Sequence, residues 1–119
     1  MFTPATVIKL YRATAILFIL TLFTVGSVPA TGQAFPGNSH WIAHLTAYAL
    51  IAFFCGLGWP NWRAVFIALF VATIGLVHEL TEIITHAHPF EQNDVVINAT
   101  GALIGVLILS IIREFRLKN

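Results

Sequence analysis

The chain has 119 residues, of which 58% are hydrophobic and only 9% are charged, and its net charge is +1. Average soluble domains are about 25% charged, so this composition disfavours an ordinary soluble enzyme and a disordered chain. Six Lys and Arg against five Asp and Glu provide no basic patch for a nucleic acid. The single cysteine, Cys55, excludes an internal disulfide and a cysteine-based metal knuckle. A small integral membrane protein of one domain remains.

Four apolar segments are long enough to cross a hydrocarbon core, which takes about 20 helical residues. They lie at about 13–30, 41–57, 64–85 and 95–112, and the segments between them contain Gly, Pro and Asn. The sequence therefore predicts an all-α, polytopic four-helix bundle. The first segment, with Lys9 and Arg12 ahead of it and Val28-Pro29-Ala30 near its end, is also similar to a secretory signal. We interpret it as a retained helix.

The basic residues of a four-pass chain would all lie on one side of the membrane. The connections after the first and third segments contain no Lys or Arg, whereas the remaining extramembrane segments contain all six: Lys9, Arg12, Arg63, Arg113, Arg116 and Lys118. The positive-inside rule assigns that side to the cytoplasm. We therefore expect a multi-pass protein of the plasma (inner) membrane with both termini in the cytoplasm.

With this orientation, polar residues of the last three segments gather near the outer leaflet. A carboxylate within a span is costly unless it faces the bundle interior and has a partner, so Glu79 is the strongest candidate for a functional group. We predict a ligand pocket in which Glu79 is the anchoring acid and His44, Tyr48 and Asn98 are its hydrogen-bond partners. The full predicted set is His44, Tyr48, Glu79, Glu82, Asp94 and Asn98.

Several of these residues also have a purely structural interpretation. Asp94 could be the N-cap of the fourth helix, and Asn98 could join two helices through its amide. Gly101 and Gly105 form a GxxxG pair that lets two helix backbones approach closely.

A metal site is weakly indicated. His78-Glu79-Leu80-Thr81-Glu82 approximates the H-E-x-x-H motif with a glutamate in place of the second histidine. The weak candidate ligands are His78, Glu82, His86 and His88. The two carboxylates could equally share a proton. We predict no metal and no other cofactor.

Three pieces of the sequence resemble the VanZ-like family of small membrane proteins. They are His44 with Tyr48, Glu79 within the third span, and the D-x-x-x-N-x-x-G-x-x-x-G pattern from Asp94 to Gly105. The resemblance covers about residues 40–109. The chain departs from the family pattern at four positions: an Asp-Lys pair is replaced by His40 and Trp41, a glutamine by Glu82, and an arginine by His88. These changes remove two cations and add an acid.

The resemblance implies a cell-envelope function connected with susceptibility to glycopeptide antibiotics of the teicoplanin type. The expected ligand is a membrane lipid or a lipid-linked envelope precursor, and no nucleic acid is expected. Two alternatives stay open: a metal- or proton-dependent membrane enzyme acting on a lipid head group, and an accessory subunit of a larger membrane complex. The chain could also form a homo-oligomer.

Overall fold

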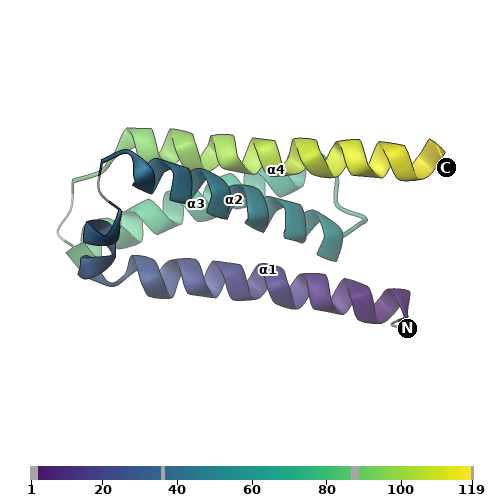
Figure 1. Cartoon of the computed structure of the whole chain (residues 1–119), viewed down its shortest axis with the longest axis horizontal. Helices are drawn as coiled ribbons and strands as arrows, with labels where there is room; N and C mark the ends of the chain where they lie inside the picture. Colours follow the sequence, from purple (N-terminus) through teal and green to yellow (C-terminus); the bar gives the residue numbers. More distant parts are fainter. Residues whose placement is uncertain (1–2, 36, 87–88, 119) are drawn as a thin grey trace.

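The computed structural model describes residues 3–35, 37–86 and 89–118 and confirms the all-α fold (Figure 1). Four long α-helices and one short 3₁₀ helix follow one another: α1 (Pro4–Gly26), η1 (Pro29–Ala34), α2 (Ser39–Gly58), α3 (Ala64–His86) and α4 (Gln92–Lys118). Each α-helix is long and apolar enough to cross a membrane. The start of α1 and the end of α4 lie at the same end of the bundle.

The first helix differs from the predicted span 13–30. It begins at Pro4 because the Thr3 side chain caps it by accepting a hydrogen bond from the Thr6 N–H, and Pro4 occupies a favourable first position. It ends at Gly26, and Val28 to Ala30 belong to the cap and start of η1 rather than to the span. The apolar composition continues past Gly26, so it did not indicate where the helix ends. A separate short helix begins at Pro29.

The fourth helix is also longer than the predicted span 95–112, and this changes the interpretation of Asp94. The helix starts at Gln92, so Asp94 lies within its first turn and is not the N-cap. A carboxylate there still interacts favourably with the positive end of the helix dipole. At the other end, α4 continues to Lys118, with Arg116 and Lys118 in its last turn.

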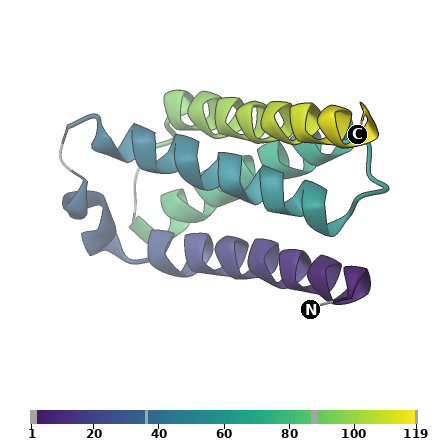
Figure 2. The same cartoon turned by 45° about the vertical axis from the view of Figure 1, so that its right-hand side comes forward.

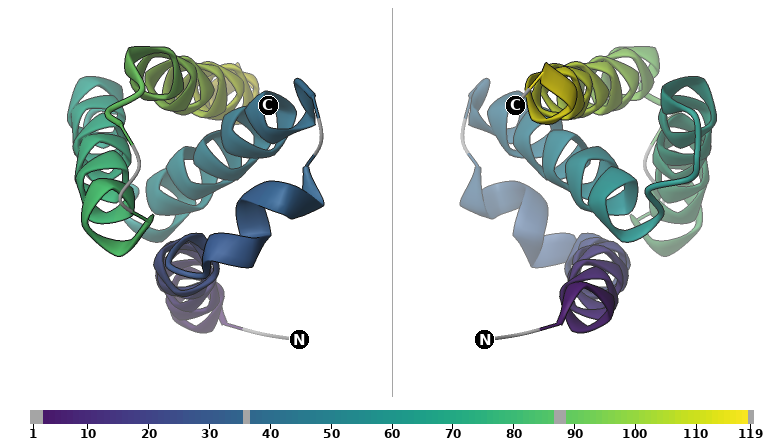
Figure 3. Two further views of the ribbon diagram at one scale, coloured as in Figure 1. Left: turned by 90° about the vertical axis from the view of Figure 1, so that its left-hand side faces the viewer. Right: turned by 90° about the vertical axis from the view of Figure 1, so that its right-hand side faces the viewer.

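The core lies between α2, α3 and α4, and α1 packs beside it. Seen end-on, α2, α3 and α4 form a three-helix group, and α1 lies against its α2 side (Figure 3). Ala15 is the one buried residue of α1, whereas α2 alone buries Tyr48, Ile51, Ala52 and Cys55. Helix α1 is therefore an outer helix, and η1 continues from it across the end of the bundle that is remote from the two termini (Figure 2).

Two arginines fix the C-terminal end of α2. Arg12 Nε of α1 donates to the carbonyl oxygen of Gly58 at 2.7 Å, and the Arg12 guanidinium lies 5.4 Å from the centre of the Trp59 ring. Arg113 of α4 donates to the carbonyl oxygen of Gly56 at 2.7 Å. The last carbonyls of a helix have no partner within it, so these bonds tie α1 and α4 to α2 at the end near the termini.

Candidate functional site

The opposite end of the bundle contains a pocket of about 640 Å³. It lies between the α1–η1 segment and α2, and residues of α3 and α4 also line it. Its lining consists of Phe18, Thr21, Leu22, Val25, Gly26, Pro29, Thr31, Phe35, His40, Ala43, His44, Ala47, Ile51, His78, Glu82, Glu91 and Asp94. A volume of this size is typical of small-molecule sites.

Several of the residues that line the pocket on α1 and α2 are apolar. Phe18, Leu22 and Val25 come from α1, and Ala47 and Ile51 come from α2. We call these five residues the apolar wall. None of them has a hydrogen-bonding side chain, so this part of the pocket can accept hydrocarbon but cannot orient a polar group.

The pocket is also lined by six histidine and acidic residues, and we call this set the polar floor: His40, His44, His78, Glu82, Glu91 and Asp94. Two histidine–carboxylate contacts cross it. His40 Nε2 lies 3.9 Å from Asp94 Oδ1, and His78 Nε2 lies 3.8 Å from Glu82 Oε1. No Lys or Arg is among the lining residues that the structure describes. The floor therefore combines imidazoles with three carboxyl groups.

Behind the floor lies a layer of buried polar residues. Tyr48, Glu79 and Asn98 are each at most 1% exposed. His44 Nδ1 donates to Asn98 Oδ1 at 2.9 Å and thereby joins α2 to α4. The His44 ring also stacks on the Tyr48 ring, with 6.4 Å between their centres. This layer fixes His44 from behind while its other face lines the pocket.

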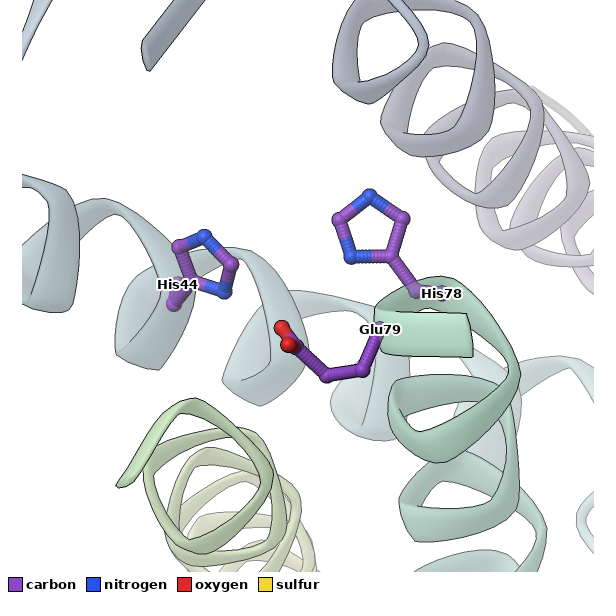
Figure 4. A group of neighbouring side chains, drawn as sticks. All are labelled: His44, His78 and Glu79. Atoms are coloured by element: carbon purple, nitrogen blue, oxygen red, sulfur yellow. The ribbon is translucent and has the colours of Figure 1, made fainter. Parts of the chain in front are cut away.

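The Glu79 carboxylate points from α3 toward the space between two imidazoles, His44 of α2 and His78 of α3 (Figure 4). One nitrogen of each ring and one oxygen of Glu79 all lie within 4.8 Å of one another. A second such group, formed by His40, Glu91 and Asp94, lies at the floor. Nitrogen and carboxylate ligands at these separations are suited to a divalent cation.

His78 reaches the pocket because the residue of α1 next to its imidazole ring is a glycine, which has no side chain. A Cβ added at Gly26 would overlap His78 Nε2. The His78 ring also lies edge-on to Phe23, with 5.4 Å between ring centres, and is only 2% exposed. Helix α1 therefore holds His78 in place as well as supplying three residues of the apolar wall.

The six predicted pocket residues lie in two layers. His44, Glu82 and Asp94 line the pocket, whereas Tyr48, Glu79 and Asn98 lie behind it. The expected hydrogen bonds to Glu79 differ from those observed: His44 bonds Asn98 instead. Among the described residues, the Tyr48 hydroxyl and Glu79 Oε1 have no hydrogen-bond partner.

Sequence reasoning missed two residues of the polar floor and underestimated a third. His40 and Glu91 are outside the predicted set of six residues, yet both line the pocket. The i, i+4 spacing of His40 and His44 was the signal that could have identified His40. His78 is a pocket residue as well as a potential ligand. Of the other weak metal candidates, His88 and the side chain of His86 lie outside the described residues.

Comparison with known proteins adds no relative: no family model, no curated protein and no solved structure matches the chain.

Proposed function

We propose that the pocket binds the head group and the adjoining hydrocarbon of an amphipathic molecule, either a membrane lipid or a lipid-linked envelope precursor. The observation that carries this proposal is the presence of the apolar wall and the polar floor in one pocket. Phe18 and Leu22 suit an alkyl or isoprenoid chain, while His44 and Asp94 suit a polar head group. At about 640 Å³, the pocket suits part of a lipid.

The charges of the floor favour particular head groups. Glu82, Glu91 and Asp94 contribute negative charge, and no lysine or arginine is among the lining residues described. A bare phosphate monoester would meet like charges at close range, which is costly in a site of low dielectric constant. We therefore expect the metal-free pocket to prefer a head group with an amine or hydroxyl groups over an anionic one.

The VanZ-like resemblance of His44, Tyr48, Glu79 and the segment from Asp94 to Gly105 supports a cell-envelope setting for this binding. In this proposal the pocket faces the outer side of a bacterial plasma membrane, where envelope precursors are used. Its physiological effect would be a changed susceptibility to glycopeptide antibiotics of the teicoplanin type.

Native mass spectrometry of the purified, metal-free protein tests the binding. Ala47 belongs to the apolar wall, so Ala47→Trp should fill the pocket and remove adducts of added phosphatidylethanolamine. Leu103→Trp is the matched control, because Leu103 lies on α4, outside the pocket lining, and is 60% exposed. We expect wild type and Leu103→Trp to bind phosphatidylethanolamine more strongly than the anionic phosphatidylglycerol.

Equal adducts in Ala47→Trp and Leu103→Trp would contradict the proposal. The same pair of variants tests the physiological role. Expression of wild type or Leu103→Trp in a susceptible bacterium should shift the inhibitory concentration of a teicoplanin-type antibiotic, and Ala47→Trp should not. A shift that persists in Ala47→Trp would separate the antibiotic effect from the pocket.

A further inference from the structure

We propose that His44, His78 and Glu79 form a binding site for a zinc-like divalent transition-metal cation. This inference goes beyond the binding of an amphipathic molecule and does not depend on it. Two histidines and one glutamate are a ligand set used by catalytic zinc sites. The three residues come from α2 and α3, so a cation bound here would also join these two helices.

The ligand atoms already lie close to the required geometry. One atom from each residue lies within 4.8 Å of the other two. Zn–N and Zn–O bonds of about 2.0–2.2 Å place the atoms of a tetrahedral site roughly 3.4 Å apart. The ligand atoms would therefore have to move closer together when a cation binds. In Figure 4 the carboxylate of Glu79 is directed between the two imidazoles, as a bridging cation would require.

The state of Glu79 is an independent indication of a cation. Its side chain is 1% exposed, and although the carboxyl group has a hydrogen bond with the Glu82 side chain, its Oε1 atom has no hydrogen-bond partner among the described residues. A buried polar atom without a partner costs about 1–3 kcal/mol, and more when the group is charged. A divalent cation between Glu79 and the two imidazoles would supply the missing interaction.

The hydrogen bond between His44 and Asn98 selects the tautomer of the His44 imidazole that can bind a cation. Because an amide oxygen only accepts, Nδ1 of His44 carries the proton that it donates to Asn98 Oδ1 at 2.9 Å. The lone pair of the ring is then on Nε2. Metal-binding histidines have such a partner on their second nitrogen in most sites, and loss of the partner lowers metal affinity 10–100-fold. Asn98 would therefore act as a positioning residue.

The position of the three ligands leaves one side of the cation open. His44 and His78 line the pocket, whereas Glu79 lies behind them. A cation held by these three residues would lie at the boundary between the buried layer and the pocket. Its fourth coordination position would face the pocket, where water or an oxygen atom of a bound head group could occupy it.

The second histidine–carboxylate group, His40 with Glu91 and Asp94, is a weaker candidate for zinc. It offers one nitrogen and two carboxylate groups, and the His40 side chain is 32% exposed. Zinc favours nitrogen ligands, and oxygen-rich sets suit harder cations. The two groups can be separated experimentally because they differ in their number of imidazoles.

Zinc titration of the purified, metal-free protein, without added lipid, tests the site. We expect one zinc ion per chain, and we expect His44→Ala and His78→Ala each to weaken binding at least about 100-fold, which exceeds the effect of losing an outer partner. His40→Ala is the matched control, since it removes a histidine of the same helix from the second group. It should leave the affinity unchanged. Loss of binding in His40→Ala alone would overturn the proposal.

A measurement on wild type keeps the test valid if a variant fails to fold. X-ray absorption of the zinc-loaded protein should show two imidazoles among the ligands at about 2.0–2.1 Å. One imidazole would assign the ion to the second group, and no imidazole or no binding at micromolar zinc would likewise overturn the proposal. Because lipid adducts are measured on the metal-free protein, each proposal can fail without the other.

Discussion

Gly105 determines how closely α4 can approach α2. A Cβ added at this position would overlap the Ala49 carbonyl oxygen and lie 2.9 Å from the Ala52 Cβ. Gly101, one turn earlier, faces the Leu45 carbonyl oxygen in the same way. Small residues that allow backbones to touch are a main source of helix association in membranes. The close contact between α2 and α4 also affects the candidate site, because Asn98 lies on the same buried side of α4.

Gly105→Ala should therefore destabilise the protein. The added methyl group meets backbone atoms that cannot rotate away, so the two helices must separate, and overpacking of this kind costs about 1–3 kcal/mol. Thermal unfolding in detergent measures the loss. Val96→Ile is the control, because it also adds one carbon to α4 but at a side chain that is 63% exposed. Equal stability of both variants would show that the close approach contributes nothing.

At the scale of whole helices, the end of α2 near the termini is held by side chains of its neighbours. Arg12 and Arg113 donate to carbonyl oxygens of Gly58 and Gly56. Helix α1 buries only Ala15 completely, and its other apolar contacts with the core, such as Phe18, are partly buried. The bond from Arg12 adds a polar link to α2 at this end of the helix. Helix α4 has many other buried contacts and depends less on Arg113.

Arg12→Met should loosen α1 while the rest of the bundle remains folded. Methionine keeps most of the aliphatic length but donates no hydrogen bond, and a bond from a charged donor contributes about 1.5–3 kcal/mol. Hydrogen–deuterium exchange should become faster in α1 and stay unchanged in α4. Arg116→Met is the control, because Arg116 is exposed and makes no hydrogen bond among the described residues. Uniform acceleration across all helices would indicate global destabilisation instead.

The sequence was informative about helices where polar residues mark their ends or faces. The limits of α2 and α3 lie within two residues of the predicted spans 41–57 and 64–85, because Pro, Asn and Gly flank them. The common depth of His44, Glu79 and Asn98 followed from the helical rise per residue. The first helix was harder: it is apolar on every side, so no periodicity indicated that Phe18, Leu22 and Val25 would form one wall of a pocket.

Hydrogen-bond partners were also beyond sequence reasoning. His44, Tyr48 and Asn98 could all have reached Glu79 at the expected depth, and only the packing of α4 against α2 decides that His44 bonds Asn98. The depth of a polar group in the membrane depends only on its position along one helix. Its hydrogen-bond partner depends on how two helices are rotated about their axes. For the same reason, the sequence could not show that His78 of α3 passes Gly26 of α1 to reach the pocket.

The molecule as a whole separates its charges along the bundle. The termini lie at one end, and the polar floor of the pocket lies near the other. All six Lys and Arg belong to α1, α4 or the connection between α2 and α3, and Arg12, Arg63 and Arg113 lie at the end shared with the termini. Such a distribution predicts that this end faces the cytoplasm and that the pocket consequently faces the outside.

Cysteine labelling in intact cells tests this orientation. In a Cys55→Ala background, which removes the one native cysteine, Asn93→Cys and Asn61→Cys form a matched pair: both positions are exposed, and they lie at opposite ends of the bundle. A membrane-impermeant maleimide should label Asn93→Cys in intact cells, because Asn93 is next to Asp94 of the polar floor, and it should label Asn61→Cys only after the membrane is opened. The reverse pattern would place the pocket in the cytoplasm and exclude direct access of extracellular envelope precursors to it.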